Sequence, residues 1–221
     1  MECAKSPRCF CCGLPAKCLV LEDGRNVCSN CLKTAIKDEQ SLFQIMEQVR
    51  SKLKTQLGLY TDNKIEYSLV DRPTLNQITG INSEIELGAY KFEERTERTI
   101  SKKIDLLGRK NKEIIEEKKT SFHQIFVLSH LSKDKAIEVC AHELAHDWLQ
   151  TYCPQIQDIK IKEGWAEYIA WLVNKSYGNS KLNKRIEQNE DAIYGDGFKT
   201  IRRIADQKGF QGLLQYLRTR N

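Results

Sequence analysis

The sequence predicts an α+β protein, with a small mixed sheet and a helical half preceded by a small cysteine-rich module and a long linking helix. Three observations predict this class. Seven of the nine cysteines fall in the first 31 residues, strand-like segments cluster between residues 64 and 131, and helical spacing of apolar residues dominates from Ser132 onward. The 221 residues suffice for one full core and an accessory module, which we expect at 1–33, with the linking helix at 34–58 and the main domain at 59–221.

The composition excludes several classes of protein. Hydrophobic residues make up 40% and charged residues 29%, as in a soluble globular protein and unlike a disordered one. No segment reaches the roughly 18 uncharged apolar residues of a membrane span, and MECAKSPRCFCC lacks the apolar stretch of a secretory signal, so we expect a cytoplasmic protein with no membrane partner. The net charge of +5 is spread over mixed-sign runs that are typical of solvated helix faces, so nucleic-acid binding is not expected.

The cysteine-rich module carries two C-x-x-C pairs separated by fifteen residues. This spacing predicts a closed tetrahedral zinc site, which is structural because it leaves no position for a substrate. So small a module buries too little apolar surface to fold alone, and metal binding would supply its folding free energy. Two alternatives stay open, that Cys11 or Cys18 replaces a ligand and that a pair is redox-active. The expected ligands are Cys9, Cys12, Cys28 and Cys31.

The residues between the two cysteine pairs predict a hairpin that turns at Asp23–Gly24. The module would dock either on a partner protein or on the main domain, and the sequence favours neither. From Lys33 to Leu57, apolar residues recur at helical spacing, and Gly58 is placed to end the run. We therefore expect one long amphipathic helix that leads out of the module.

Four segments after this helix have the composition of β-strands, namely residues 64–70, 84–92, 97–104 and 123–131. The charged stretch at 108–119 is compatible with a short helix or a mobile insertion. Ser132 or Asp134 can cap a following helix that runs to about Tyr152, and Asp158 can cap a second one that ends before Gly178. Shorter helices complete the chain, with breaks at 194–197 and at Gly209.

The first of these helices contains the sequence HELAH. Residues four apart share one face of a helix, so His142 and His146 can present two imidazole nitrogens to one metal ion. Glu143 lies beside the first ligand, where it can take a proton from a metal-bound water. The alternative is an ordinary helix with incidental histidines. Since two of the four histidines fall here, we expect a hydrolytic zinc.

A catalytic zinc of this kind needs a third protein ligand. Glu163 and Glu167 in EGWAEY lie four residues apart on the second helix, so they also share a face. We expect Glu163 to be the third ligand and Glu167 to accept the free N–H of a ligand histidine, although the two roles could be exchanged. Two solvated glutamates on an apolar helix are the alternative.

The strand at 123–131 precedes the histidine helix. We expect this strand to form an edge of the sheet, where an extended protein or peptide substrate could pair with it as an added strand. Its two histidines, His123 and His130, are expected to face solvent and to take no part in metal binding.

The segments HELAHDWL and KEGWAEY resemble the gluzincin metallopeptidases, and the chain from about Leu57 onward resembles the peptidase domain of the DA-one family of plants and its bacterial relatives. The other matching pieces are LGLYTDNKIEYSLVDRPTLN, IFVLSHL and YGDGFKTIRRIADQKGFQGLLQYL. The resemblance implies a zincin-like metallopeptidase domain. Plant members carry LIM-type zinc modules and cleave partner proteins after ubiquitin-dependent activation, whereas this chain has one short cysteine module and no acidic ubiquitin-interacting helix.

The resemblance also implies a tyrosine or histidine that stabilises the oxyanion of the tetrahedral intermediate. Tyr194, in a glycine-flanked turn, is the leading candidate, and Tyr168 and Tyr177 follow it. Together these features predict a peptidase with two zinc ions per chain, one catalytic and one structural. The alternative is a non-catalytic adaptor in which the zinc module recruits a partner protein and the peptidase-like domain is a scaffold.

Overall fold

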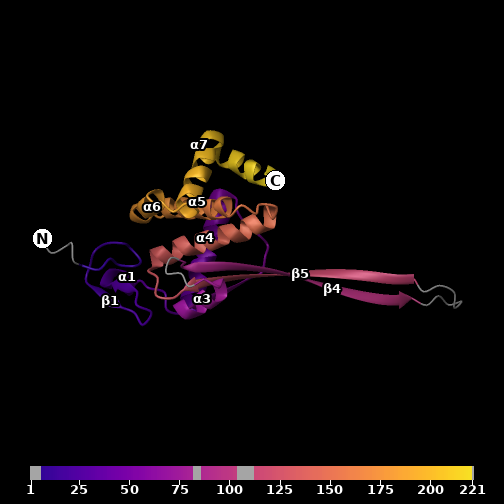
Figure 1. Cartoon of the computed structure of the whole chain (residues 1–221), viewed down its shortest axis with the longest axis horizontal. Coiled ribbons are helices and arrows are strands. Elements are labelled where there is room, and N and C mark those ends of the chain that lie inside the picture. Colours follow the sequence, from indigo (N-terminus) through magenta and orange to yellow (C-terminus); the bar gives the residue numbers. More distant parts are fainter. Residues whose placement is uncertain (1–5, 82–85, 104–111, 221) are drawn as a thin grey trace.

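The computed structural model describes residues 6–81, 86–103 and 112–220 of the chain. Two sheets and a helical half make up the fold, as predicted, and Figure 1 shows helices α4 to α7 stacked on one side of the larger sheet. The elements follow the order β1 (Cys18–Val20), β2 (Asn26–Cys28), α1 (Ser29–Lys33), α2 (Glu39–Lys52), η2 (Leu53–Leu57), β3 (Ile65–Val70), α3 (Arg72–Thr79), β4 (Gly88–Lys103), β5 (Lys112–Leu128), α4 (Lys133–Tyr152), α5 (Ile159–Ser176), α6 (Ser180–Glu187) and α7 (Tyr194–Thr219).

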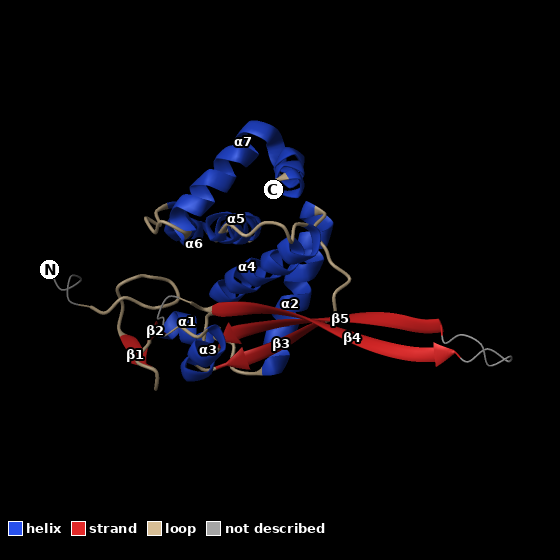
Figure 2. Cartoon of the chain, turned by 45° about the vertical axis from the view of Figure 1, so that its right-hand side comes forward, coloured by secondary structure: helices blue, strands red, loops and turns tan. Residues whose placement is uncertain are grey.

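The larger sheet has the strand order β3-β5-β4, with β5 parallel to β3 and antiparallel to β4. The strand predicted at 123–131 is therefore the central strand and not an edge. Over His123–Leu128 its backbone pairs with β3, and over His123–Val127 it also pairs with β4. No free edge is left there for a substrate, and the edge nearest the helical half is β4 (Figure 2).

Strands β4 and β5 form a long hairpin that projects from the body of the molecule (Figure 1). The separate strands predicted at 84–92 and 97–104 are one continuous strand, with residues 82–85 and 104–111 outside the described part. In the stretch 108–119, the described residues from Lys112 onward are strand and neither of the two predicted structures, while residues 108–111 lie outside the described part. Oppositely charged side chains that face each other across the two strands favour this pairing, as in Arg98 with Glu117 at 2.7 Å.

The linking helix begins at Glu39, five residues later than predicted, because residues 34–36 are not helical: Thr34 lies in a turn and Ala35 forms an isolated β-bridge with Ser132. Their backbone pairs with the residues before α4, since the N–H of Ile36 donates to the carbonyl of Leu131 at 2.9 Å. The Asp38 side chain then caps α2 by accepting the N–H of Ser41. The end at Gly58 agrees with the prediction, because this residue has the left-handed φ of 67° that favours glycine.

The helical half is built on α4, which packs against both α2 and α5 and lies over the sheet. Helices α5 and α7 approach closely at Gly164 and Gly197, where a Cβ atom on Gly164 would lie 2.3 Å from the backbone of Gly197. The YGDG segment is the first turn of α7 and not a break, whereas Gly209 interrupts the helical dihedrals as predicted. Among the residues described here, no helix is both long and apolar enough to cross a membrane.

Candidate metal centres

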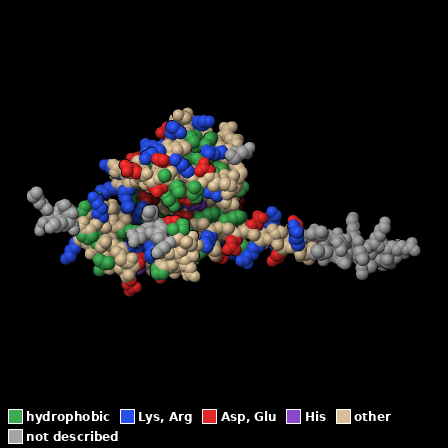
Figure 3. Space-filling view, in the orientation of Figure 1, with side chains coloured by type: hydrophobic (Ala, Val, Ile, Leu, Met, Phe, Trp, Pro, Cys, Tyr) green, Lys and Arg blue, Asp and Glu red, His purple; other side chains and the backbone are tan. Residues whose placement is uncertain are grey.

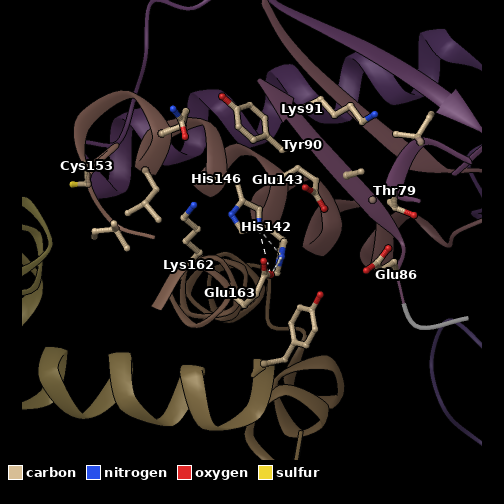
Figure 4. A pocket seen from close by; sticks show the side chains of 17 residues that line it. Thr79, Glu86, Tyr90, Lys91, His142, Glu143, His146, Cys153, Lys162 and Glu163 are labelled. Carbon is tan, nitrogen blue, oxygen red and sulfur yellow. Dashed lines mark hydrogen bonds and ion pairs between the residues drawn. The ribbon is translucent and has the colours of Figure 1, made fainter. Parts of the chain in front are cut away.

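Two histidines of α4 and one glutamate of α5 converge at the bottom of a cavity (Figure 4). His142 Nε2 lies 3.1 Å from Glu163 Oε2 and 3.1 Å from His146 Nε2, and His146 Nε2 lies 3.4 Å from Glu163 Oε2. The i,i+4 spacing on α4 places the two imidazoles together, and the packing of α5 on α4 brings in the carboxylate. These three side chains form a group that could hold a metal ion.

The geometry of this group fits zinc. Zinc bonds to imidazole and carboxylate of about 2.0–2.1 Å in a tetrahedral arrangement separate neighbouring ligand atoms by about 3.3 Å. The three observed separations of 3.1, 3.1 and 3.4 Å lie close to that value. Two imidazoles and a carboxylate are also a known ligand set of catalytic zinc, which leaves one position open.

The side chain of Glu143 lies beside this group and lines the same cavity. It is only 5% exposed, and burial raises the pKa of its carboxyl, while the neighbouring histidines act in the opposite direction. Gly88 of β4 makes room for it, since a Cβ atom there would lie 2.6 Å from Glu143 Oε1. The cavity has a volume of about 390 Å³, and Figure 3 shows histidine side chains in the hollow between the helices and the sheet.

The other ring nitrogen of His142 contacts the second glutamate of α5. His142 Nδ1 lies 3.3 Å from Glu167 Oε1. Burial by itself lowers the pKa of His142, but the hydrogen bonds to Glu163 and Glu167 outweigh it and raise this pKa well above its ordinary value. Burial opposes ionisation of Glu163, yet the hydrogen bonds from the two histidines hold its pKa well below the usual range. Glu163 thus faces both imidazoles, while Glu167 faces one imidazole from its far side.

Tyr194, at the start of α7, lines the cavity, and its ring centroid lies 6.4 Å from that of His142. Burial and the nearby carboxylates raise the pKa of its phenol, so the hydroxyl keeps its proton at neutral pH. The two other tyrosines lie elsewhere. Tyr168 packs on Trp171, and the ring of Tyr177 lies 4.0 Å from Lys52 Nζ. Neither lines the cavity.

His123 was predicted to face solvent, but this prediction is wrong, because the residue is only 6% exposed. Its Nδ1 lies 2.8 Å from Asp147 Oδ1 and 2.9 Å from the hydroxyl of Tyr90. The buried Asp147 also accepts a hydrogen bond from Thr61 at 2.5 Å, so the residue after His146 ties α4 both to His123 of β5 and to the loop before β3. His130 is half-buried, and neither histidine belongs to a group that could hold a metal ion among the described residues.

The second group consists of four cysteines of the N-terminal module, whose sulfur atoms lie within 4.8 Å of one another. Zinc–sulfur bonds of about 2.3 Å in a tetrahedron place sulfurs about 3.8 Å apart, and the Sγ atoms of Cys12 and Cys28 are 4.0 Å apart. Burial raises the pKa of Cys9, but three backbone N–H groups outweigh it and lower this pKa to about 7, which favours the thiolate that binds metals. The members are Cys9, Cys12, Cys28 and Cys31.

The two alternative cysteines lie outside this group. Cys11 Sγ accepts the backbone N–H of Ser132, the residue that precedes α4, at 3.4 Å. Cys18 Sγ points to the carbonyl of Ala16 at 3.4 Å. The contact of Cys11 and a hydrogen bond of 2.9 Å from Arg25 to the carbonyl of Ser129 dock the module on the main domain. The predicted hairpin between the cysteine pairs is present as β1 and β2.

Sequence reasoning did not single out most of the residues that line the cavity, among them Gly88, Tyr90, Lys91 and Lys162. The glycine carried a signal, because a glycine inside a strand pattern often marks a close approach of another group. The tyrosine and the lysines carried none, since ordinary strands and helices contain such residues.

The chain is similar to two proteins of Arabidopsis thaliana. It is 24% identical over 264 aligned residues to Protein DA1-related 1, which covers 96% of this chain and 47% of that protein. It is 24% identical over 248 residues to Protein DA1-related 2, with 90% and 46% covered. The chain therefore spans about half the length of these curated relatives. The similarity supports the resemblance to the DA-one-like family, while no family model and no solved structure matches the chain.

Proposed function

We propose that the chain is a zinc-dependent peptidase of the zincin type. The observation that carries the proposal is the convergence of His142, His146 and Glu163 beside the buried carboxylate of Glu143, in a cavity that opens on a sheet edge. The similarity to the DA1-related proteins agrees with the proposal, because their sequences align with nearly all of this chain. A zinc ion held by these three ligands would acidify a bound water and polarise a peptide carbonyl.

Glu143 acts as the general base in this proposal. Its burial raises the pKa of the carboxyl, and a more basic carboxylate is a better acceptor for the proton of the attacking water. The same carboxyl then gives the proton to the leaving amine. Glu167 orients His142 from the opposite side of the ring, which keeps Nε2 directed at the centre.

Tyr194 stabilises the oxyanion. Its raised pKa keeps the phenol protonated, so the hydroxyl can donate a hydrogen bond to the developing charge. The substrate backbone pairs with β4 rather than with the strand at 123–131, because Gly88 to Lys91 lie on the outer strand of the sheet and line the cavity.

The decisive experiment compares the wild type with Glu143→Gln. The variant keeps the shape of the side chain and all three ligands, so we expect an unchanged zinc content by elemental analysis and a loss of peptide cleavage by about 10²- to 10⁴-fold. Comparison of new protein N-termini in cells that express either form would identify the substrates. Equal cleavage by the two forms would contradict the proposal.

The adaptor alternative makes a different prediction. A degenerate peptidase scaffold would bind zinc only through the cysteines, about one ion per chain, and would give no new N-termini in either form. A zinc content of about two per chain together with cleavage that depends on Glu143 would exclude it.

A further inference from the structure

The hairpin of β4 and β5 extends well beyond the sheet. Strand β3 covers β5 only over His123–Leu128, so the distal part, which we call the arm (residues 93–103 and 112–122), has two strands. Figure 1 shows the arm leaving the body, and Figure 3 shows side chains of both charges along it up to the grey residues. An isolated two-stranded ribbon is marginally stable in water, so the arm would gain stability from a further strand.

The outer edge of β4 is available for such a strand. In the described part of the chain, β4 pairs only with β5, and this edge runs without interruption from Gly88 to Lys103. All side chains from Lys91 to Thr99 are exposed. Unpaired strand edges bind other strands readily, and the charges that flank them decide which partner is accepted.

The edge sequence Glu93–Glu94–Arg95–Thr96–Glu97–Arg98–Thr99 is complementary to itself when it is turned around Thr96. In an antiparallel pair centred there, Glu94 faces Arg98 of a second copy and Arg95 faces Glu97 of that copy. A two-fold axis perpendicular to the sheet keeps each side chain on its own face. Four opposite-charge pairs result, and the two Thr96 residues of the dimer lie opposite each other.

Other registers are disfavoured by the same charges. A shift of one residue places Arg95 opposite Arg98 in one direction and Glu94 opposite Glu97 in the other. A shift of two residues places Arg95 or Glu97 opposite itself. Like charges directly opposite each other are destabilising, so the sequence selects a single register for self-pairing.

Ion pairs within each arm extend this pattern. Lys119 Nζ lies 3.1 Å from Glu94 Oε1, and Arg98 Nε lies 2.7 Å from Glu117 Oε1. Lys119 lies opposite Thr96 and reaches Glu94 diagonally. A chain of ion pairs across the four strands would therefore run from Glu117 through Arg98 to Glu94 and Lys119 of the second copy, with alternating sign throughout. These exposed pairs are individually weak, but a network of them favours one alignment.

We infer that the outer edge of β4 along residues 93–99 of the arm, beyond the segment Gly88–Lys91 that lines the cavity, is a homodimer interface, in which the arms of two copies pair antiparallel around Thr96 into a four-stranded ribbon. The outer edge of β5 is the poorer choice, because β3 covers it from His123 onward and shortens the ladder. The four exposed charge pairs make the dimer weaken as salt rises.

Sedimentation velocity over a range of protein concentrations, at low and at high salt, tests the interface. The wild type dimerises, and more tightly at low salt. Arg98→Glu alone and Glu94→Arg alone each place like charges at two symmetric positions, so each dimerises at least about tenfold more weakly. An equimolar mixture of the two variants restores the dimer, because each reversed charge then meets its complement.

The mixture also controls for misfolding, since two damaged arms would not recover on mixing. Lys181→Glu is the matched control, because it reverses an exposed charge on α6, away from the arm, and should leave the dimer intact. A wild type that is monomeric at all concentrations, a mixture that stays monomeric, or a dimer that is lost equally in Lys181→Glu would each overturn the inference. None of these measurements depends on peptidase activity.

Discussion

The two candidate metal centres differ in how they are enclosed. The four cysteines lie in the turn at 9–12, at the end of β2 and in α1, and three of them are at most 8% exposed. The centre at His142, His146 and Glu163 lies at the bottom of a cavity of about 390 Å³. A closed set of four ligands can only hold its ion, whereas three ligands beside a cavity leave a position for water and substrate. Ligand number and enclosure together therefore separate a structural role from a catalytic one.

The two candidate centres also differ in how far their residues lie apart in the chain. The cysteine set spans residues 9–31, so the module assembles its site almost locally. The second set needs α4 and α5 to pack correctly, and α7 must approach to bring Tyr194 into the cavity. Loss of an ion should consequently unfold the module but leave the packed helices folded.

Among variants that test the difference between the two candidate centres, we expect His142→Ala to have the largest effect. This change removes one of only three ligands, so cleavage should be abolished and the zinc content should fall from about two ions per chain to about one. Thermal unfolding should change little, because the core around Trp165 and Phe198 does not depend on the ion. The control is His130→Ala. His130 lies outside both groups of candidate ligands, so this variant should keep both ions. Full zinc content in His142→Ala would contradict the assignment.

Cys31→Ser should break the other centre. Structural zinc supplies roughly 10 kcal/mol or more of folding free energy in small zinc modules, so the first 33 residues should become protease-sensitive and lose their ion. The histidine centre should keep its zinc. Limited proteolysis and elemental analysis check both points, with Cys18→Ser as the matched control outside the group. If Cys18→Ser rather than Cys31→Ser released the ion, the ligand set would be wrong.

Tyr194→Phe tests the proposed oxyanion-stabilising role of Tyr194 at the centre that lies in the cavity. Loss of a hydrogen-bond donor to an oxyanion should lower kcat by about 10²-fold, with little change in KM or zinc content. Tyr168→Phe serves as the control, because this tyrosine packs on Trp171 outside the cavity. An unchanged kcat in Tyr194→Phe would remove the proposed role and leave the metal centre unaffected.

The smallest effect is expected from Glu167→Gln. The carboxylate contacts His142 Nδ1, and loss of such support typically lowers metal affinity by about 10- to 100-fold. Competition with a chelator measures this change, and the exposed Glu190 offers a neutral comparison as Glu190→Gln. Complete loss of the ion in Glu167→Gln, with retention in Glu163→Gln, would show that the two glutamates exchange roles.

Local sequence patterns correctly predicted those features of the fold that depend on residues close together in the chain. The i,i+4 spacing brings His142 and His146 together, and the side chain of Asp158 caps α5 as its position predicted. The hairpin at Asp23–Gly24 and the left-handed glycine at Gly58 are equally local, and the structure confirms both elements.

Predictions that required non-local knowledge were wrong more often. The strand ending at Leu128 looks like an edge strand in sequence, but pairing on both sides makes it central. His123 was predicted to be a surface residue, but it contacts Asp147 of α4 and Tyr90 of β4, two elements whose approach the sequence did not indicate. The strand predicted at 97–104 is part of the arm, but its partner strand from Lys112 onward was not expected, because charged residues are poor strand formers and the cross-strand charge pairs that favour it are not local.

Residue type and spacing within single helices and turns were enough to predict the α+β class, the proximity of the two HELAH histidines and the clustering of the four cysteines, because these depend mainly on contacts within short segments. The tertiary structure decided which strand is the edge, which side of His142 each glutamate faces, and that Tyr194 lines the cavity. These features depend on how separate elements pack. The close approach of Gly164 and Gly197 is a clear case, since neither glycine indicates in sequence that it will meet the other.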